Sequence, residues 1–195
     1  MLIFLAKIIS WVLNPLVVLL PVPYILVAHF TKGRSPLLWM EFSFLFMLIA
    51  AFLIALFVFK GYFSDLDVSK KEERPLLFLL VGIITVFYLL SLFILSGPIV
   101  LYIAVLAITV GLLILYFVSH FLKASIHVVV LSSFLLGVAL IYKGPTFFLF
   151  LLLPLVMWSR IKLKRHTLKE TIAGLILGLT LTIAVSLVVK LFIKL

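Results

Sequence analysis

The side chains of this sequence that could perform chemistry gather in the stretch 159–170, where a histidine is followed four residues later by a glutamate. His166 and Glu170 would face the same way on a helix, because side chains four residues apart are neighbours there. The carboxylate could then accept the hydrogen of one ring nitrogen and set the tautomer, which leaves the other nitrogen as a nucleophile. A neutral imidazole held in this way can attack phosphorus and form a phosphohistidine.

Hydrolysis of a phosphate ester without a metal also requires a proton for the leaving oxygen and cations around the phosphoryl oxygens. His127, near the start of a predicted helix, is the candidate proton donor, and Ser125 with the free N–H groups of that helix end could bind an anion. Arg160 and Arg74 could each hold phosphoryl oxygens through two hydrogen bonds. We expect no cofactor and no metal ion at this site, and the lack of cysteine excludes thiolate ligands.

Glu170 has two possible roles in this stretch. As a partner of His166 it would raise the pKa of the imidazole while nearby cations lower it, so we expect that pKa to lie near neutrality. The residues Thr-Leu-Lys-Glu at 167–170 also form a capping box, in which Glu170 closes the start of a helix. The two roles do not exclude each other.

The elements that must position these groups are membrane-spanning helices. Apolar residues make up 67% of the chain and charged residues 11%, against about 45–50% and about 25% in soluble domains. A helix crosses the bilayer with about 20 apolar residues. The sequence predicts an all-α bundle of six to seven transmembrane helices, at 2–30, 36–59, 76–95, 99–121, 125–142, 146–158 and 171–192.

Two of these segments are irregular. The sixth has about 13 apolar residues, which at about 1.5 Å per residue reach about 20 Å, so it would have to thin the bilayer or recruit flanking residues. Prolines in the first segment predict either a kinked span or a re-entrant hairpin. No repeat or linker divides the chain, so we expect a single integral membrane domain over residues 1–195.

Counting helices places three polar segments on one side of the membrane. Two predicted helices lie between Arg74 and His127, and two more lie between His127 and His166. Two crossings return a chain to the face that it left, so the three segments emerge together and could form one site. Ordinary polar loops would share a face in the same way, without any chemical role.

The polar segments resemble a known family. Residues 159–170 follow the pattern S-R-x5-H-x3-E, which is similar to the third motif of the type 2 phosphatidic acid phosphatase superfamily, S-R-x5-H-x3-D. Ala-Ser-Ile-His at 124–127 resembles the second motif, P-S-G-H, and Arg74-Pro75 resembles the end of the first motif, K-x6-R-P. The resemblance extends from about Asp67 to Gly178 and implies a core at about 60–195.

This resemblance implies a helical membrane enzyme that hydrolyses lipid phosphates through a phosphohistidine, without a metal. It implies that His166 is the nucleophile, that His127 is the acid, and that the matching arginines and serine bind the phosphate. The first motif has its lysine where this chain has Asp67, so Lys70 or Lys71 is the expected substitute. Ile126 replaces the glycine of the second motif, and a catalytically weak or inactive relative therefore remains an alternative.

Other classes of function account for less of the sequence. A UbiA-type prenyltransferase would bind a diphosphate through magnesium between two aspartate-rich motifs, and Asp65 with Asp67 is the only such pair. A lipid-binding or assembly subunit predicts no particular order of loop residues. A transporter would place ionisable groups in mid-helix, where only Glu41 comes close.

The net charge of +10 indicates contact with anionic head groups or a phosphorylated substrate rather than with nucleic acid. A site at the edge of the bilayer suits an amphiphile such as phosphatidic acid, phosphatidylglycerol phosphate, a lipid A phosphate or a prenyl diphosphate. We expect the protein in the inner cell membrane, with the side of the site left open. Gly174 and Gly178 predict close helix packing and a possible homo-oligomer through the last helix.

Overall fold

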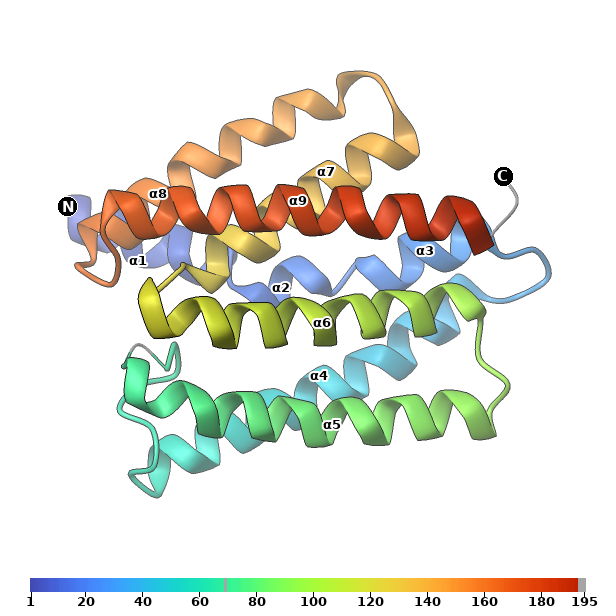
Figure 1. Cartoon of the computed structure of the whole chain (residues 1–195), viewed down its shortest axis with the longest axis horizontal. Helices are drawn as coiled ribbons and strands as arrows, with labels where there is room; N and C mark the ends of the chain where they lie inside the picture. The colour runs from blue at the N-terminus through green and yellow to red at the C-terminus, as the bar shows by residue number, and fades with distance from the viewer. Residues whose placement is uncertain (69, 193–195) are drawn as a thin grey trace. The chain divides into compact units, whose positions relative to one another are not determined.

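The computed structural model describes residues 1–68 and 70–192, and these residues form an all-α protein without a strand. The prediction of an all-α fold is confirmed (Figure 1). The elements are α1 (Leu2–Val12), α2 (Pro15–Leu19), α3 (Val22–Phe30), α4 (Pro36–Phe59), η1 (Lys71–Glu73), α5 (Arg74–Ile94), α6 (Ile99–Phe121), α7 (Ile126–Tyr142), η2 (Pro145–Leu151), α8 (Leu152–Lys162) and α9 (Leu168–Phe192).

Five helical stretches in the described residues are long and apolar enough to cross a membrane: Leu2–Phe30, Pro36–Phe59, Lys71–Ile94, Ile99–Val118 and Leu168–Lys190. Large apolar side chains cover their outer surfaces, as the 66% exposure of Phe52 on α4 and the 77% exposure of Phe93 on α5 illustrate. Exposure of so much apolar area to water would be unfavourable, whereas lipid solvates it. The protein is therefore an integral membrane protein.

The sixth predicted segment is longer than its apolar run suggested. It begins as the 3₁₀ helix η2 of 7 residues and continues through the 11 residues of α8 to Lys162. A 3₁₀ helix rises about 2.0 Å per residue and an α-helix about 1.5 Å, so the pair reaches about 30 Å. The apolar run therefore recruits flanking residues, one of the two alternatives that its length allowed, because α8 includes the polar residues after Trp158.

The first predicted segment is broken twice, at Asn14-Pro15 and near Pro21. Proline has no N–H to donate to the preceding turn, and the Asn14 side chain instead accepts a hydrogen bond from the Leu16 amide at 3.0 Å. The predicted interruptions are confirmed. The kinked span and the re-entrant hairpin both stay predictions.

The chain forms two compact units. The first unit contains Met1–Leu19 and the chain from Phe121 onward, and the second unit contains Leu20–His120. The expectation of one domain over residues 1–195, with a core at about 60–195, stays a prediction. In the second unit, α4 and α5 are joined by a buried hydrogen bond of 2.8 Å between Ser43 Oγ and Tyr88 OH.

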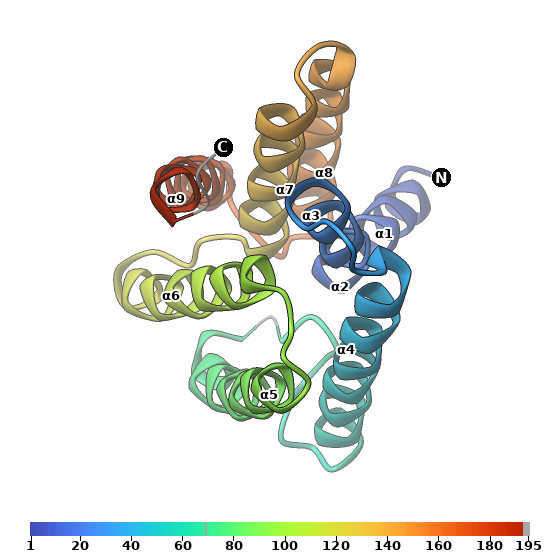
Figure 2. The same ribbon diagram turned by 90° about the vertical axis from the view of Figure 1, so that its right-hand side faces the viewer.

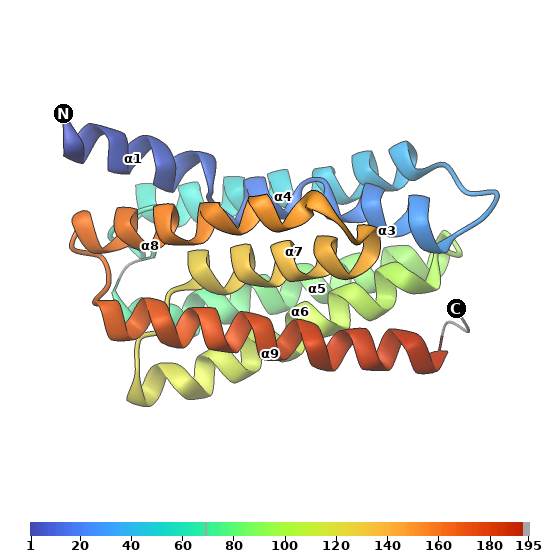
Figure 3. The same cartoon turned by 90° about the horizontal axis from the view of Figure 1, so that it is seen from above.

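In the first unit, α7 and α9 lie side by side and run in the same direction (Figure 3). The Ser125 amide at the start of α7 donates to the Glu170 carbonyl at 3.2 Å, and further along Ser133 Oγ donates to the Gly178 carbonyl at 3.0 Å. An end-on view places α7 beside α8 as well (Figure 2). The core between these helices and α2 consists of apolar side chains: Val18, Val128, Leu131, Leu135, Leu153 and Val156.

Gly174 and Gly178 allow α9 to approach α7 closely. A Cβ at position 174 would lie 2.8 Å from the Ser125 carbonyl oxygen, and one at position 178 would overlap the Ser132 side chain and the Val129 carbonyl. The close packing expected of the G-x-x-x-G pattern thus occurs within one chain. The possible homo-oligomer through α9 stays a prediction.

Candidate active site

The turn between α8 and α9 is built so that His166 stands just before α9. The Arg165 amide donates to the Arg160 carbonyl at 3.0 Å and the Lys164 amide to the Ile161 carbonyl at 2.9 Å, which is the bonding pattern of a Schellman motif. Lys164 takes the left-handed conformation that this motif requires, with φ of 56°. The carbonyls of Arg160 and Ile161 are thereby satisfied, and the chain turns directly into the histidine.

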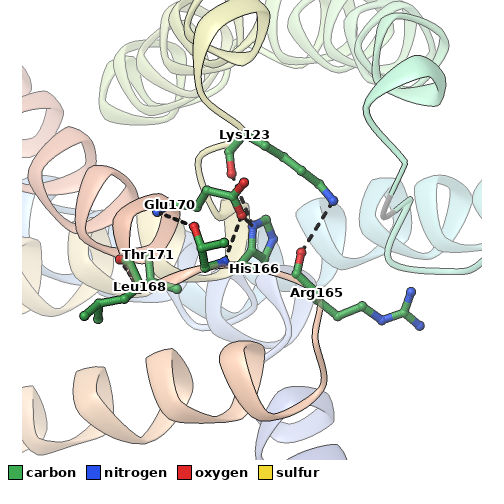
Figure 4. Close-up of polar contacts among 7 residues, drawn as sticks. Lys123, Arg165, His166, Leu168, Glu170 and Thr171 are labelled. Carbon is green, nitrogen blue, oxygen red and sulfur yellow. Dashed lines mark hydrogen bonds and ion pairs between the residues drawn. The ribbon is translucent and has the colours of Figure 1, made fainter.

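The His166 ring is held by two acceptors on one nitrogen. Nδ1 lies 3.1 Å from Glu170 Oε2 and 3.2 Å from the backbone carbonyl oxygen of Lys123 (Figure 4). Neither a carboxylate nor a carbonyl can donate a hydrogen, so Nδ1 must carry the proton. In the neutral ring, the lone pair is then on Nε2.

The pKa of His166 is lowered to about 4. Burial of the ring is the largest cause, the positive charge of Arg160 lowers the pKa further, and the hydrogen bond to Glu170 opposes both. Lys123 adds a smaller lowering contribution. The expected pKa near neutrality is corrected, because the side chain is only 5% exposed and sequence alone did not show this desolvation. The imidazole is neutral at physiological pH.

Glu170 fills both roles that the sequence offered. Its Oε2 accepts the Thr167 amide at 3.0 Å, and its own amide donates to Thr167 Oγ1 at 3.3 Å, which completes the capping box at the start of α9. The same oxygen accepts from His166. The cap therefore fixes the carboxylate that orients the ring.

Arg160 lies in the last turn of α8 and is only 2% exposed. Its Nη1 donates to Ser10 Oγ of α1 at 2.6 Å, and the neighbouring Ser159 Oγ donates to the Ala6 carbonyl at 2.7 Å. These two bonds attach α8 to α1. They hold the guanidinium at a place from which its charge acts on His166.

Ser125 is the N-cap residue of α7 and is fully buried. Its amide donates to the backbone carbonyl of Glu170, but its Oγ has no hydrogen-bond partner among residues 1–68 and 70–192. His127, 5% exposed, lies in the first turn of α7. The second and third polar segments thus lie at the same end of the first unit, as the helix count predicts.

The remaining predicted site residues belong to the second unit. Arg74 is the first residue of α5 and is buried, with 3% exposure. Lys70 lies 3.8 Å from the Glu73 carboxylate with a side chain that is 64% exposed, and Lys71 is exposed at the start of η1. That these three residues join the histidines at one phosphate stays a prediction.

Sequence reasoning missed Lys123. Its backbone carbonyl accepts from the His166 ring, and its Nζ donates to the Arg165 carbonyl at 3.4 Å. The available signal was a lysine two residues before Ser125. Ser10 was also missed, because a serine inside an apolar helix gives no sign of the arginine that it will contact.

Within the described part of the chain, no group of three or more His, Cys, Asp or Glu side chains could hold a metal ion. Comparisons with protein-family models, with characterised proteins and with solved structures find no match to this chain.

Proposed function

We propose that this protein is a membrane-embedded lipid phosphate phosphatase that acts through a phosphohistidine intermediate and needs no metal ion. The observation that carries the proposal is the arrangement of His166. Nδ1 donates to acceptors, the ring is neutral, and the lone pair of Nε2 is the nucleophile. The order and spacing of the polar motifs, which resemble those of the type 2 phosphatidic acid phosphatases, support the same chemistry.

In the first step, Nε2 of His166 attacks phosphorus and the bond to the leaving oxygen breaks. His127 gives its proton to that oxygen, so the lipid leaves as a neutral alcohol. The ring gains positive charge as the N–P bond forms, and the Glu170 carboxylate stabilises it through Nδ1. Arg160, Ser125 and the amides at the start of α7 bind the phosphoryl oxygens.

In the second step, water attacks the phosphohistidine. His127, now neutral, accepts a proton from the water as the new P–O bond forms and the N–P bond breaks. Inorganic phosphate leaves, and His166 regains its lone pair. The neutral state of His166 suits this cycle, because a protonated ring would have no electron pair for phosphorus.

The substrate class follows from the place of the site at one end of membrane-spanning helices. A phosphate on an amphiphile can reach this end while its chain stays in lipid, so phosphatidic acid, phosphatidylglycerol phosphate, a lipid A phosphate and a prenyl diphosphate all fit. We place the protein in the inner cell membrane.

The test measures phosphate release from these lipids by the purified protein in detergent, with and without EDTA. We expect release that survives EDTA and is lost in His166→Ala and His127→Ala. His29→Ala is the matched control, because this exposed histidine in the last turn of α3 belongs to none of the three motifs. Turnover that persists in His166→Ala would reject the mechanism, and phosphate binding without turnover would identify an inactive relative.

A further inference from the structure

We infer that Lys123 is a phosphate-binding residue of this site, with its ammonium group on the phosphoryl group that His166 accepts. The inference rests on the proposed function and adds a residue to it. Lys123 lies in the short loop between α6 and α7, two residues before the N-cap Ser125.

Two contacts place Lys123 against the nucleophile. Its carbonyl oxygen lies 3.2 Å from His166 Nδ1, which fixes the main chain of Lys123 beside the ring. Its Nζ lies 3.4 Å from the carbonyl oxygen of Arg165, the residue just before His166 (Figure 4). The two ends of Lys123 therefore bracket His166, and the ammonium is within reach of a group bound to the ring.

The negative charge of a phosphoryl group bound to His166 also favours a role for the Lys123 ammonium. A phosphoryl group carries about two negative charges, and the positive charges that act on His166 are those of Arg160 and Lys123. Arg160 and Lys123 together balance the charge of one phosphoryl group.

The chemistry of the Lys123 ammonium suits an anion. A separation of 3.4 Å exceeds the usual 2.7–3.2 Å of an N–H···O hydrogen bond, and the Arg165 carbonyl carries no net charge. An ammonium has three donors on a flexible stem, so it can reach a phosphoryl oxygen without releasing the loop.

The main-chain contact makes a clean test possible, because every residue at position 123 keeps the carbonyl that orients His166. Lys123→Met removes the charge at similar length, and Lys123→Arg restores it. Lys162→Met is the matched control, since Lys162 is an exposed lysine in the last turn of α8 at the same end of the unit. We expect Lys123→Met to lower kcat/KM for phosphatidic acid about 10- to 100-fold, Lys123→Arg to recover part of the loss, and Lys162→Met to resemble the wild type.

Binding of inorganic phosphate, followed by the thermal midpoint in detergent, separates this inference from the proposed function. Lys123→Met should weaken phosphate binding about tenfold or more, whether or not the wild type turns over lipid phosphates. Wild-type protein that releases no phosphate would defeat the proposed function alone. Equal phosphate affinity in Lys123→Met and wild type, or no phosphate binding by the wild type, would overturn the role of Lys123.

Discussion

Glu170→Gln is the substitution that most directly separates catalysis from helix capping. Glu170 Oε2 accepts from both His166 Nδ1 and the Thr167 amide, so the carboxylate serves the ring and the helix at once. Glutamine keeps an acceptor oxygen but removes the charge. The interaction lost is the one that strengthens as the ring becomes positive during attack on phosphorus.

The size of the effect follows from the hydrogen bond at 3.1 Å between Nδ1 and the carboxylate. A hydrogen bond to a charged group contributes about 1.5–3 kcal/mol, and about 1.4 kcal/mol corresponds to a tenfold change in rate. We therefore expect kcat to fall about 10- to 150-fold in Glu170→Gln. KM should change little, because the lost interaction belongs to the transition state.

Thr167→Ala is the control for the helix cap. It removes the acceptor of the Glu170 amide and leaves the contact between Glu170 and His166 in place. Loss of such a cap costs about 0.5–2 kcal/mol, so the thermal midpoint should fall while kcat stays near that of the wild type. Phosphate release and thermal unfolding of both variants would be measured in the same detergent. Equal losses of kcat in the two variants would show that Glu170 only caps α9 and refute the reasoning.

Three further predictions concern packing and protonation in the first unit. Gly178→Ala should lower stability by about 1–3 kcal/mol because its Cβ meets α7, while Gly137→Ala, with open space around it, should not lower the thermal midpoint. NMR of isotope-labelled histidine, assigned with His166→Asn, should show His166 as the neutral Nδ1–H tautomer down to about pH 5; a midpoint near 6.5 would contradict its burial. Since the folded-state pKa of about 4 lies below the ordinary 6.5, the unfolded chain binds a proton first as pH falls, and stability should decrease by about 3 kcal/mol between pH 6.5 and 4. His166→Asn should remove the loss of stability that comes from protonation of His166. A pH profile of the thermal midpoint that is the same in His166→Asn and wild type would argue against this contribution.

Features that depend on neighbouring residues could be predicted from the sequence. Long apolar runs determine membrane-spanning helices, because each such run satisfies its backbone hydrogen bonds internally and places its side chains in lipid. The spacing of Thr167, His166 and Glu170 predicts both the capping box and the contact with the ring, because these bonds lie within one helical turn. The close approach at Gly174 and Gly178 follows in the same way from the absence of side chains.

The tertiary structure decided what depends on residues far apart in the chain. The tautomer of His166 is set in part by the carbonyl of Lys123, and Arg160 is held by Ser10 of α1. The low pKa of His166 results from burial, which depends on how the helices pack rather than on any local pattern. The extra length of the sixth segment likewise follows from α8 continuing through Arg160 to Lys162, because contact with α1 buries a charge that an apolar count treats as loop. Sequence periodicity indicates which face of a helix is apolar, but it does not indicate which other helix packs against that face.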